Sequence, residues 1–321
     1  MHRRLPDPLF EHVRFLVGPT ASGKSTVAMR LAEASQSTRP LEILALDSMT
    51  LYRGFDIGTA KPTPEDRARV PHHFVDVLGP LDGHTVADYV DAAVTCCEAI
   101  VDRGCIPLFV GGSGMFLRAM LRGLFEGPPS DPVVRADLEA EAMRVGEVRF
   151  HRMLEEIDPE SAAKIHPNDV RRVVRAREVF MLTGQTLSSM HREDARQDRL
   201  ARCIWLDGPR DWMHERINHR VQVMIDDGWV EEAQRLLALD PEPGTVFWKM
   251  LGYDILAEHL RGDRSLDSAI EAIQIATRQF AKRQVTWFRN LDECQPLSFA
   301  RETTLDQLVH EAAVRLELPT P

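Results

Sequence analysis

The chain has 321 residues, of which 44% are hydrophobic and 27% charged, and its formal net charge is −10. Because single hydrophobic cores stop growing at about 250–300 residues, this length predicts one main domain with a sizeable insertion. The composition excludes a mainly disordered chain, and the acidic balance argues against a nucleic-acid binder that is basic over its whole surface, although a local basic patch stays open.

Cysteine usage and the N-terminus indicate the compartment. Five cysteines are not a disulfide framework in a chain of this length, and no C-x-x-C pair is present for a thiolate metal site. The N-terminus lacks the apolar run of a signal peptide, and no stretch reaches about 18 uncharged apolar residues. We therefore expect a cytoplasmic protein that has reduced thiols and no membrane segment.

Short apolar runs alternate with helical patterns along much of the chain. The strand patterns cover residues 13–17, 41–46, 106–110 and 202–206. The helical patterns cover residues 25–34 and 87–103 and a segment that starts near Trp212. Glycines follow the first and third of these strands. Such alternation is typical of a parallel α/β sheet flanked by helices.

The segment from residue 131 to 196 differs, because it shows helical patterns and no convincing strand. Asp131-Pro132 is a typical helix start, Asp169 caps another helix, and Gly184 ends it. We predict an α/β core over residues 13–130 and 197–290, an inserted all-helical subdomain over 131–196, and a C-terminal tail over 291–321. Within the core, a long helix over 265–289 carries an apolar face that includes Phe280 and Phe288.

Residues 18–25 match the phosphate-loop pattern G-x-x-x-x-G-K-[ST], between a predicted strand and a predicted helix. Glycines let backbone N–H groups converge on phosphate oxygens, and the helix N-terminus adds its positive end. Lys24 supplies a positive charge, and Ser25 supplies a hydroxyl suited to Mg²⁺. The pattern predicts a P-loop NTPase-like fold and a phosphate site, but not the identity of the ligand.

Asp47 follows the second predicted strand, and ligands of open α/β sheets collect at the carboxyl ends of strands. A carboxylate there can hold Mg²⁺ or accept a proton from a nucleophile beside the phosphates. It can also simply form a turn through its own backbone. Residues 52–62, which follow, read as an exposed loop.

Several motifs together resemble the bacterial tRNA dimethylallyltransferases. They lie in order at residues 18–25, 47–48, 52–54, 56–62, 71–74, 111–114, 165–169 and 277–288. The Gly-Thr-Ala-Lys-Pro and Ala-Lys-Arg-Gln-x-Thr-Trp segments are far more specific to this family than the phosphate loop is. The resemblance implies transfer of a dimethylallyl group from its diphosphate to N6 of adenosine 37 in the anticodon loop of tRNA.

The resemblance also implies roles for individual residues. Asp47 would be the general base, and Ser113 and Arg220 would also serve catalysis. The diphosphate would be held with Mg²⁺ at Ser25 by Gly18, Thr20, Ala21, Ser22, Gly23, Lys24, Ser25 and Arg216. Arg216 and Arg220 lie one helical turn apart, and we favour Arg220 as the arginine that reaches the diphosphate.

Two segments depart from the family pattern. Ser113 stands where threonine is usual and keeps the hydroxyl, whereas Phe116 stands where tyrosine is usual and loses a phenol. Residues 49–51, Met-Thr-Leu, replace the commoner Ala-Gln-Val.

Basic residues form local stripes on this acidic chain. By resemblance, contacts to tRNA would come from Asp47, Ser48, Met49, Thr50, Arg135, Arg171, Arg172, Arg175, Arg278, Lys282 and Arg283. The inserted subdomain would grip the anticodon stem, and the target adenine must leave its stack to reach Asp47. The expected partners are tRNA and dimethylallyl diphosphate, and we expect a monomer.

Three other functions remain open on these motifs. A small-molecule kinase shares the phosphate loop and the sheet but does not account for the basic stripes. An enzyme that isoprenylates free adenine nucleotides would not need the inserted helix with Arg171. A nucleotide switch without chemistry leaves Asp47, Ser113 and Arg220 without a task.

Overall fold

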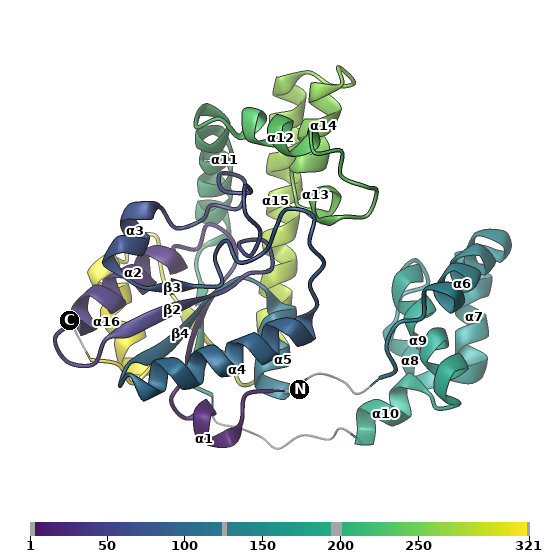
Figure 1. Ribbon diagram of the computed structural model, residues 1–321, viewed down its shortest axis with the longest axis horizontal. Coiled ribbons are helices and arrows are strands. Elements are labelled where there is room, and N and C mark those ends of the chain that lie inside the picture. Colours follow the sequence, from purple (N-terminus) through teal and green to yellow (C-terminus); the bar gives the residue numbers. More distant parts are fainter. Residues whose placement is uncertain (1–3, 124–126, 194–200, 320–321) are drawn as a thin grey trace. The chain divides into compact units, whose positions relative to one another are not determined.

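The computed structural model describes residues 4–123, 127–193 and 201–319 (Figure 1). The chain divides into two compact units, one of Met1–Gly123 with Arg199–Pro321 and the other of Leu124–Asp198. The predicted insertion, residues 131–196, falls inside the second unit. In the described part of the chain, no helix is long and apolar enough to cross a membrane.

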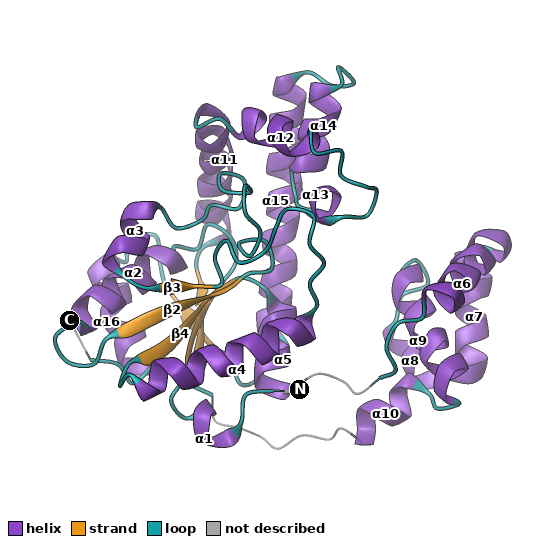
Figure 2. Cartoon of the chain, viewed as in Figure 1, coloured by secondary structure: helices purple, strands orange, loops and turns teal. Residues whose placement is uncertain are grey.

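One parallel sheet organises the first unit, with the strand order β3-β2-β4-β1-β5-β6. Its strands are β1 (Arg14–Val17), β2 (Leu41–Leu46), β3 (His72–His73), β4 (Ile106–Gly111), β5 (Cys203–Asp207) and β6 (Gln295–Ser298). Helices lie on both faces of the sheet (Figure 2). The predicted fold class, a P-loop-like parallel α/β sheet flanked by helices, is confirmed.

The helices of the first unit fall into two groups along the chain. Those that precede the second unit are α1 (Asp7–Phe10), α2 (Lys24–Ser35), α3 (Pro64–Arg69), α4 (Val86–Asp102) and α5 (Gly114–Arg122). Those that follow it are α11 (Arg210–Asp226), α12 (Trp229–Leu237), α13 (Val246–Lys249), α14 (Tyr253–Leu260), α15 (Leu266–Arg289) and α16 (Leu305–Arg315).

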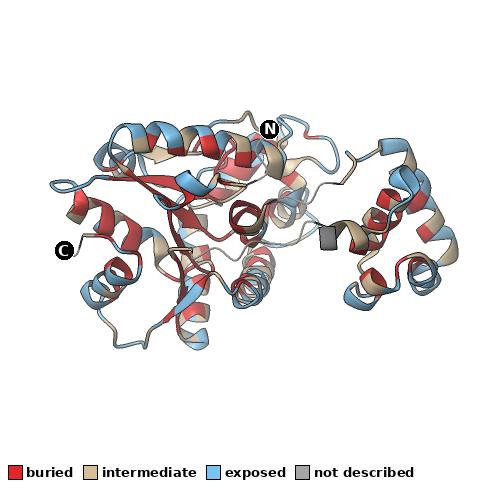
Figure 3. Ribbon diagram, turned by 90° about the horizontal axis from the view of Figure 1, so that it is seen from below, coloured by how far each residue is buried: buried red, intermediate tan, exposed pale blue. Residues whose placement is uncertain are grey.

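The central strands are buried along their whole length because both of their faces are covered, and apart from Arg14 and Glu42 their residues are apolar or small. Leu16 and Leu108 belong to the cluster that also holds Val27 of α2. On the other face of the sheet, Phe15 stacks on Phe109, with ring centroids 5.1 Å apart. Figure 3 shows the buried strands between helices whose outer faces are exposed. Two-sided burial explains why these strands read as continuous apolar runs and not as alternating ones.

The C-terminal segment is part of the core, so the interpretation of residues 291–321 as a tail is wrong. Strand β6 pairs in parallel with β5, and Leu297 is 3% exposed. Ala312 of α16, and Leu316 directly after that helix, lie in the same core cluster as Leu16 of β1. The pattern conceals β6 because it is a short edge strand of which only Leu297 is buried.

Helices α11, α12, α13, α14 and α15 pack against one another and extend beyond the end of the sheet (Figure 1). The predicted long helix is confirmed as α15, and the Ser265 side chain accepts a hydrogen bond from the N–H of Ser268 at its start. Phe288 is buried as expected, but Phe280 is 39% exposed. Phe280 lines a cavity and does not pack in the core.

The second unit is all-helical. Its helices are α6 (Pro132–Val145), α7 (Glu147–Ile157), α8 (Pro159–Lys164), α9 (Val170–Thr183) and α10 (Leu187–Glu193). They bury a separate apolar cluster that contains Leu138, Phe150 and Val173. The predicted caps are confirmed, because Asp131 accepts hydrogen bonds from two backbone N–H groups at the start of α6, and Gly184 ends α9 with φ +72°.

Candidate functional site

A cavity of about 880 Å³ lies in the first unit, where the carboxyl ends of β2 and β4 meet the N-terminus of α2. Its wall includes Lys24, Asp47 and Gly111 from this edge of the sheet. Helices α11 and α15 contribute Arg220 and Arg283. The predicted phosphate loop and the predicted base therefore share one cavity.

The phosphate loop has the backbone that its sequence predicts. Ala21 and Gly23 have φ values of +64° and +91°, in the left-handed region, and Gly23 immediately precedes α2. Val27 continues the helix from there by donating its N–H to the Gly23 carbonyl. A left-handed turn into a helix N-terminus directs backbone N–H groups toward one point, which suits a phosphate.

Gln284 joins three parts of the site. Its side-chain oxygen accepts a hydrogen bond from the N–H of Thr20 at 2.8 Å, and its amide nitrogen donates to the carbonyl of Gly112 at 2.9 Å. The residue is 5% exposed, and a Cβ added at Gly112 would lie 2.2 Å from its amide nitrogen. Helix α15 thereby fixes the position of the phosphate loop relative to the Gly-Gly turn after β4.

Three ionisable groups in the cavity influence one another. Burial and the positive charge of Arg220 together lower the pKa of Lys24 to about 8, against the opposing effect of Asp47. Burial likewise lowers the pKa of Arg220, with help from Arg216 and against Asp47. Burial raises the pKa of Asp47 and outweighs the N–H of Met49 and the two positive charges. The site thus places two positive groups where an anion would bind, beside a carboxylate with increased proton affinity.

Asp47 also makes the turn that its sequence position allowed. Its carboxylate accepts a hydrogen bond from the N–H of Met49 at 2.9 Å, and its carbonyl accepts one from the Thr50 hydroxyl at 3.2 Å. These local bonds hold the side chain, which still lines the cavity. The structural and the chemical interpretation of Asp47 are therefore compatible.

The two arginines of α11 have different surroundings. Arg220 lines the cavity. Arg216 donates to the carbonyl of Ala21 at 3.0 Å and lies over the Trp212 ring, 4.5 Å from its centroid. Arg220 therefore lines the cavity, whereas Arg216 binds the backbone of the phosphate loop.

Ser113 begins α5, directly after the Gly-Gly turn, and its N–H donates to the carbonyl of Leu46 at 3.2 Å. This contact lies one residue before Asp47, although the Ser113 side chain is not among the described residues that line the cavity. Phe116 is buried against Tyr89, with ring centroids 4.3 Å apart, and so belongs to the core.

The segment predicted as an exposed loop is largely fixed in place, so that expectation is wrong. Phe55 is 1% exposed, and the Lys61 side chain is 4% exposed. Lys61 donates to the carbonyl of Tyr52 and to the carboxylates of Asp56 and Asp76. The hydrophilic residue types of this segment suggested exposure, whereas the Lys61 ammonium group is buried and paired within the protein. Residues 58–62 form part of the cavity wall.

The arginines predicted to meet tRNA are not equivalent. Glu178, whose side chain has no exposed surface, accepts hydrogen bonds from Arg175 at 2.8 Å and Arg135 at 3.2 Å. Arg172 pairs with Asp169 at 3.3 Å and is exposed, as is Arg171. Two of these four side chains therefore also hold the second unit together.

The basic residues of α15 show the same division. Arg278 is half-buried and donates to the side-chain oxygen of Asn218. Lys282, Arg283 and Arg289 are exposed, and of these Arg283 lines the cavity.

The residues present suit a magnesium ion that is bound mainly through phosphate. Mg²⁺ keeps several waters and commonly takes one or two protein ligands besides substrate phosphates. Ser25 lines the cavity next to Lys24 at the start of α2 and can supply such a ligand. No group of three or more histidines, cysteines or carboxylates that could hold a metal occurs among the described residues.

Comparison with known proteins identifies the family. A model of the IPP transferase family matches residues 50–291. The chain belongs to the IPP transferase family. A tRNA dimethylallyltransferase of Geobacter sulfurreducens is 44% identical over 274 residues, which cover 85% of this chain and 87% of that protein. One of Thermotoga neapolitana is 39% identical over 301 residues, covering 93% and 96%. The resemblance predicted from the motifs is confirmed.

Solved structures agree. A full-length tRNA isopentenylpyrophosphate transferase of Bacillus halodurans superposes with a TM-score of 0.67 at 34% identity, covering 95% of this chain and 96% of that one. A eukaryotic dimethylallyltransferase shares the fold, with a TM-score of 0.75 at 24% identity over 94% and 77% of the two chains. This family member is thus an enzyme of the prenyltransferase class.

Sequence reasoning gave no role to several residues of the site. Gln284 and residues 58–62 lie in motifs of the family, but the sequence predicted no role for them. Glu232, described below, lies in none of these motifs. Trp229 and Tyr253 also line the cavity. The signal that could have found Gln284 is a polar residue on the otherwise apolar inner face of α15, where it must be paired to be buried.

Proposed function

We propose that this enzyme transfers a dimethylallyl group from dimethylallyl diphosphate to N6 of adenosine 37 in the anticodon loop of tRNA. The observation that carries the proposal is a single cavity lined by Lys24, Arg220 and Asp47, in a chain of this family. An anion site and a carboxylate of raised pKa are what a diphosphate leaving group and an amine nucleophile require.

The step balances with the groups present. N6 of adenine bonds to C1 of the dimethylallyl group as the bond from C1 to the diphosphate oxygen breaks, and the diphosphate leaves with that electron pair. An exocyclic amine is a poor nucleophile because its lone pair is delocalised into the ring. Asp47 would accept the N–H proton as the C–N bond forms, which favours attack.

The leaving diphosphate gains negative charge, which the positive groups of the cavity offset. Lys24, Arg220 and the backbone N–H groups of residues 23–25 at the start of α2 would bind it. Mg²⁺ held at Ser25 would add a further positive charge on the phosphate oxygens. Arg216 supports this arrangement through the carbonyl of Ala21.

Recognition of tRNA would involve both units. In the second unit, the exposed Arg171 and Arg172 on α9 are suited to backbone phosphates. Lys282 and Arg283 on α15 offer the same chemistry in the first unit. The adenine must leave its stack to reach Asp47, which lies inside a cavity.

Incubation with labelled dimethylallyl diphosphate separates the candidate functions. We expect label in tRNA, none in AMP, and no hydrolysis of ATP or requirement for it. Label in AMP without tRNA would establish the enzyme that acts on free nucleotides. Strict dependence on ATP with phosphate transfer to a small molecule would establish a kinase.

A further inference from the structure

A buried carboxylate outside the phosphate site anchors one wall of the cavity. Glu232 of α12 is 2% exposed. It accepts hydrogen bonds from the backbone N–H groups of Asp56 at 2.8 Å, Ile57 at 2.9 Å and Gly58 at 3.2 Å. The hydroxyl of Tyr253 also donates to it. Helices α12 and α14 and the loop after β2 therefore meet at one side chain.

The chemistry of this contact requires a carboxylate. One oxygen of Glu232 accepts from Asp56 and Ile57, and the other accepts from Gly58 and Tyr253. Each carboxylate oxygen has two lone-pair sites, so four donors match its full capacity. A glutamine at this position can accept at only one of the two atoms, because its amide nitrogen is a donor.

The anchored loop is the cavity wall itself. Residues 58–62 line the cavity, as do Trp229 and Tyr253 behind them. A Cβ added at Gly58 would lie 2.2 Å from the Trp229 indole nitrogen and 2.6 Å from the Tyr253 hydroxyl, so the backbone is pressed against both rings. Lys61 fixes the far end of the same loop through Asp56 and Asp76.

Contacts run from this loop to the segment of Asp47. The carboxylate of Asp76 pairs with Lys61 at 2.6 Å. The backbone N–H of Asp76 donates to the carbonyl of Thr50 at 3.1 Å. The Thr50 hydroxyl in turn donates to the carbonyl of Asp47 at 3.2 Å. The side of the cavity that carries Asp47, where the acceptor adenine would enter, is called the acceptor side. It therefore depends on the loop of residues 56–62.

The phosphate side has separate supports. Gln284 holds Thr20, and Arg216 holds Ala21, and neither contact involves the loop of residues 56–62. Loss of the Glu232 anchor should therefore disturb the space that receives the adenine and leave the diphosphate site in place.

We propose that Glu232 is a positioning residue that shapes the acceptor side of the cavity by holding the loop of residues 56–62 against α12 and α14. This inference rests on the proposed function, because it names the part of the site that the tRNA nucleotide enters. Glu232 would not contact the reacting atoms.

The variant Glu232→Gln tests this role with little change of volume. We expect the KM for tRNA to rise at least about tenfold, because the entering nucleotide would meet a displaced wall, and misplacement by about 1 Å can cost about 100-fold in catalytic efficiency. The KM for dimethylallyl diphosphate should stay within about twofold. Amide hydrogen exchange should accelerate at residues 56–58 and not at residues 20–25. A loss of folded protein alone would lower kcat and leave both KM values unchanged.

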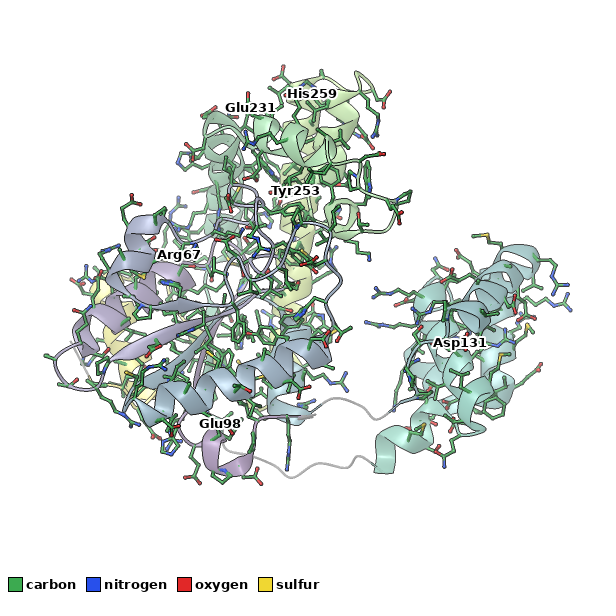
Figure 4. The ribbon with its side chains drawn as sticks, viewed as in Figure 1. Arg67, Glu98, Asp131, Glu231, Tyr253 and His259 are labelled. Carbon is green, nitrogen blue, oxygen red and sulfur yellow. The ribbon has the colours of Figure 1, made fainter. Side chains whose placement is uncertain are left out.

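Two further variants complete the test. Glu231→Gln changes the exposed neighbour of Glu232 on the same helix and should behave as wild type (Figure 4). Tyr253→Phe removes one of the four donors and leaves the three backbone contacts, so it should give a smaller rise in the KM for tRNA. This variant also tests the role of Glu232 if Glu232→Gln does not fold.

Unchanged KM for tRNA and unchanged exchange at residues 56–58 in Glu232→Gln would overturn the positioning role. A wild-type enzyme that transfers no label to tRNA would instead overturn the proposed function, so the two failures are distinguishable.

Discussion

Opposing influences act on the carboxylate of Asp47. Burial raises its pKa, while the N–H of Met49 and the charges of Lys24 and Arg220 lower it, and burial prevails. A base must be deprotonated to act, and its affinity for the proton increases with its pKa. If Asp47 is the base, as proposed, burial in the cavity strengthens it, and the acid limb of activity should lie above the range of an exposed aspartate.

Replacement of this base should separate chemistry from binding. Asp47→Asn keeps the size of the side chain and cannot accept the proton, so we expect the single-turnover rate to fall about 10²–10⁴-fold. Binding of diphosphate and tRNA should change little. The acid limb seen with wild type, where the rate rises with pH as Asp47 ionises, should disappear. A single-turnover rate near that of wild type would remove Asp47 from this role.

Lys24 predicts a second pH effect, at the alkaline end. Burial and Arg220 lower the pKa of Lys24 to about 8 in the free enzyme, so its positive charge is present below that pH and is lost above it. We expect the Kd for inorganic diphosphate to be constant below pH 8 and to rise up to about tenfold per unit above it. Calorimetry across this range measures the effect.

The matched variant is Lys24→Ala, which should bind diphosphate weakly at every pH and show no inflection near 8. If this variant retained the inflection, another group would be responsible for it.

Among the secondary-structure elements, α9 carries two tasks on one helix. Burial alone would raise the pKa of Glu178, but hydrogen bonds from Arg175, Ser130 and the N–H of Asp131 outweigh it and lower the pKa. The Glu178 carboxylate thus binds residues 130–131, which precede α6, to α9. Arg175 completes the contact by donating to the carbonyl of Pro128 at 2.8 Å.

Glu178 should therefore control the stability of the second unit. Glu178→Gln leaves buried donors without an acceptor, so we expect the unfolding free energy of this unit to fall by about 1–3 kcal/mol. Because the pKa of Glu178 is lowered in the folded unit, its ionised carboxylate stabilises the unit at pH values above 4.5, the ordinary glutamate pKa. This stabilisation is lost as the pH falls through the pKa of Glu178 in the folded unit.

Hydrogen exchange of residues 127–193 as a function of pH measures both effects. In the variant, the part of the acid sensitivity due to Glu178 should be missing. Protection equal to that of wild type at neutral pH would contradict this role for Glu178.

Some elements were predictable from sequence because their signals are local. The strands β1, β2 and β4 are buried on both faces, and the helix caps Asp131 and Ser265 act within a few residues. The edge strand β6 and the hydrogen-bond partners of Glu232 and Gln284 were not predictable. Their partners lie far away in the chain, as in the pairing of Thr20 with Gln284, and only the folded chain brings them together.

On the scale of the whole molecule, the proposed binding of tRNA requires local positive charge on an acidic chain with a net charge of −10. Arg135 and Arg175 are partly neutralised by Glu178. Arg171 and Arg172 are exposed, and the bond of Arg172 to Asp169 lies at the surface, where such pairs contribute little. These last two are therefore the arginines of α9 best suited to exchange solvent for phosphate.

Salt dependence tests this assignment. Each lost phosphate contact should reduce the slope of log Kd against log salt by about one unit. Arg171→Ala with Arg172→Ala should thus weaken tRNA binding at low salt and reduce the slope by about two units. The Kd for dimethylallyl diphosphate should not change, because its proposed site lies in the other unit. Neither substitution touches Glu178, so the second unit should stay folded.

The matched control is Arg144→Ala with Arg149→Ala, which removes the same charge from exposed positions on α6 and α7 of the same unit. If the effect came only from net charge, both pairs would weaken tRNA binding equally. If α9 contacts the phosphates directly, the control slope stays near that of wild type. Filter binding of tRNA at several salt concentrations decides between them, and equal slopes for the two double variants would exclude α9 as the tRNA-binding face.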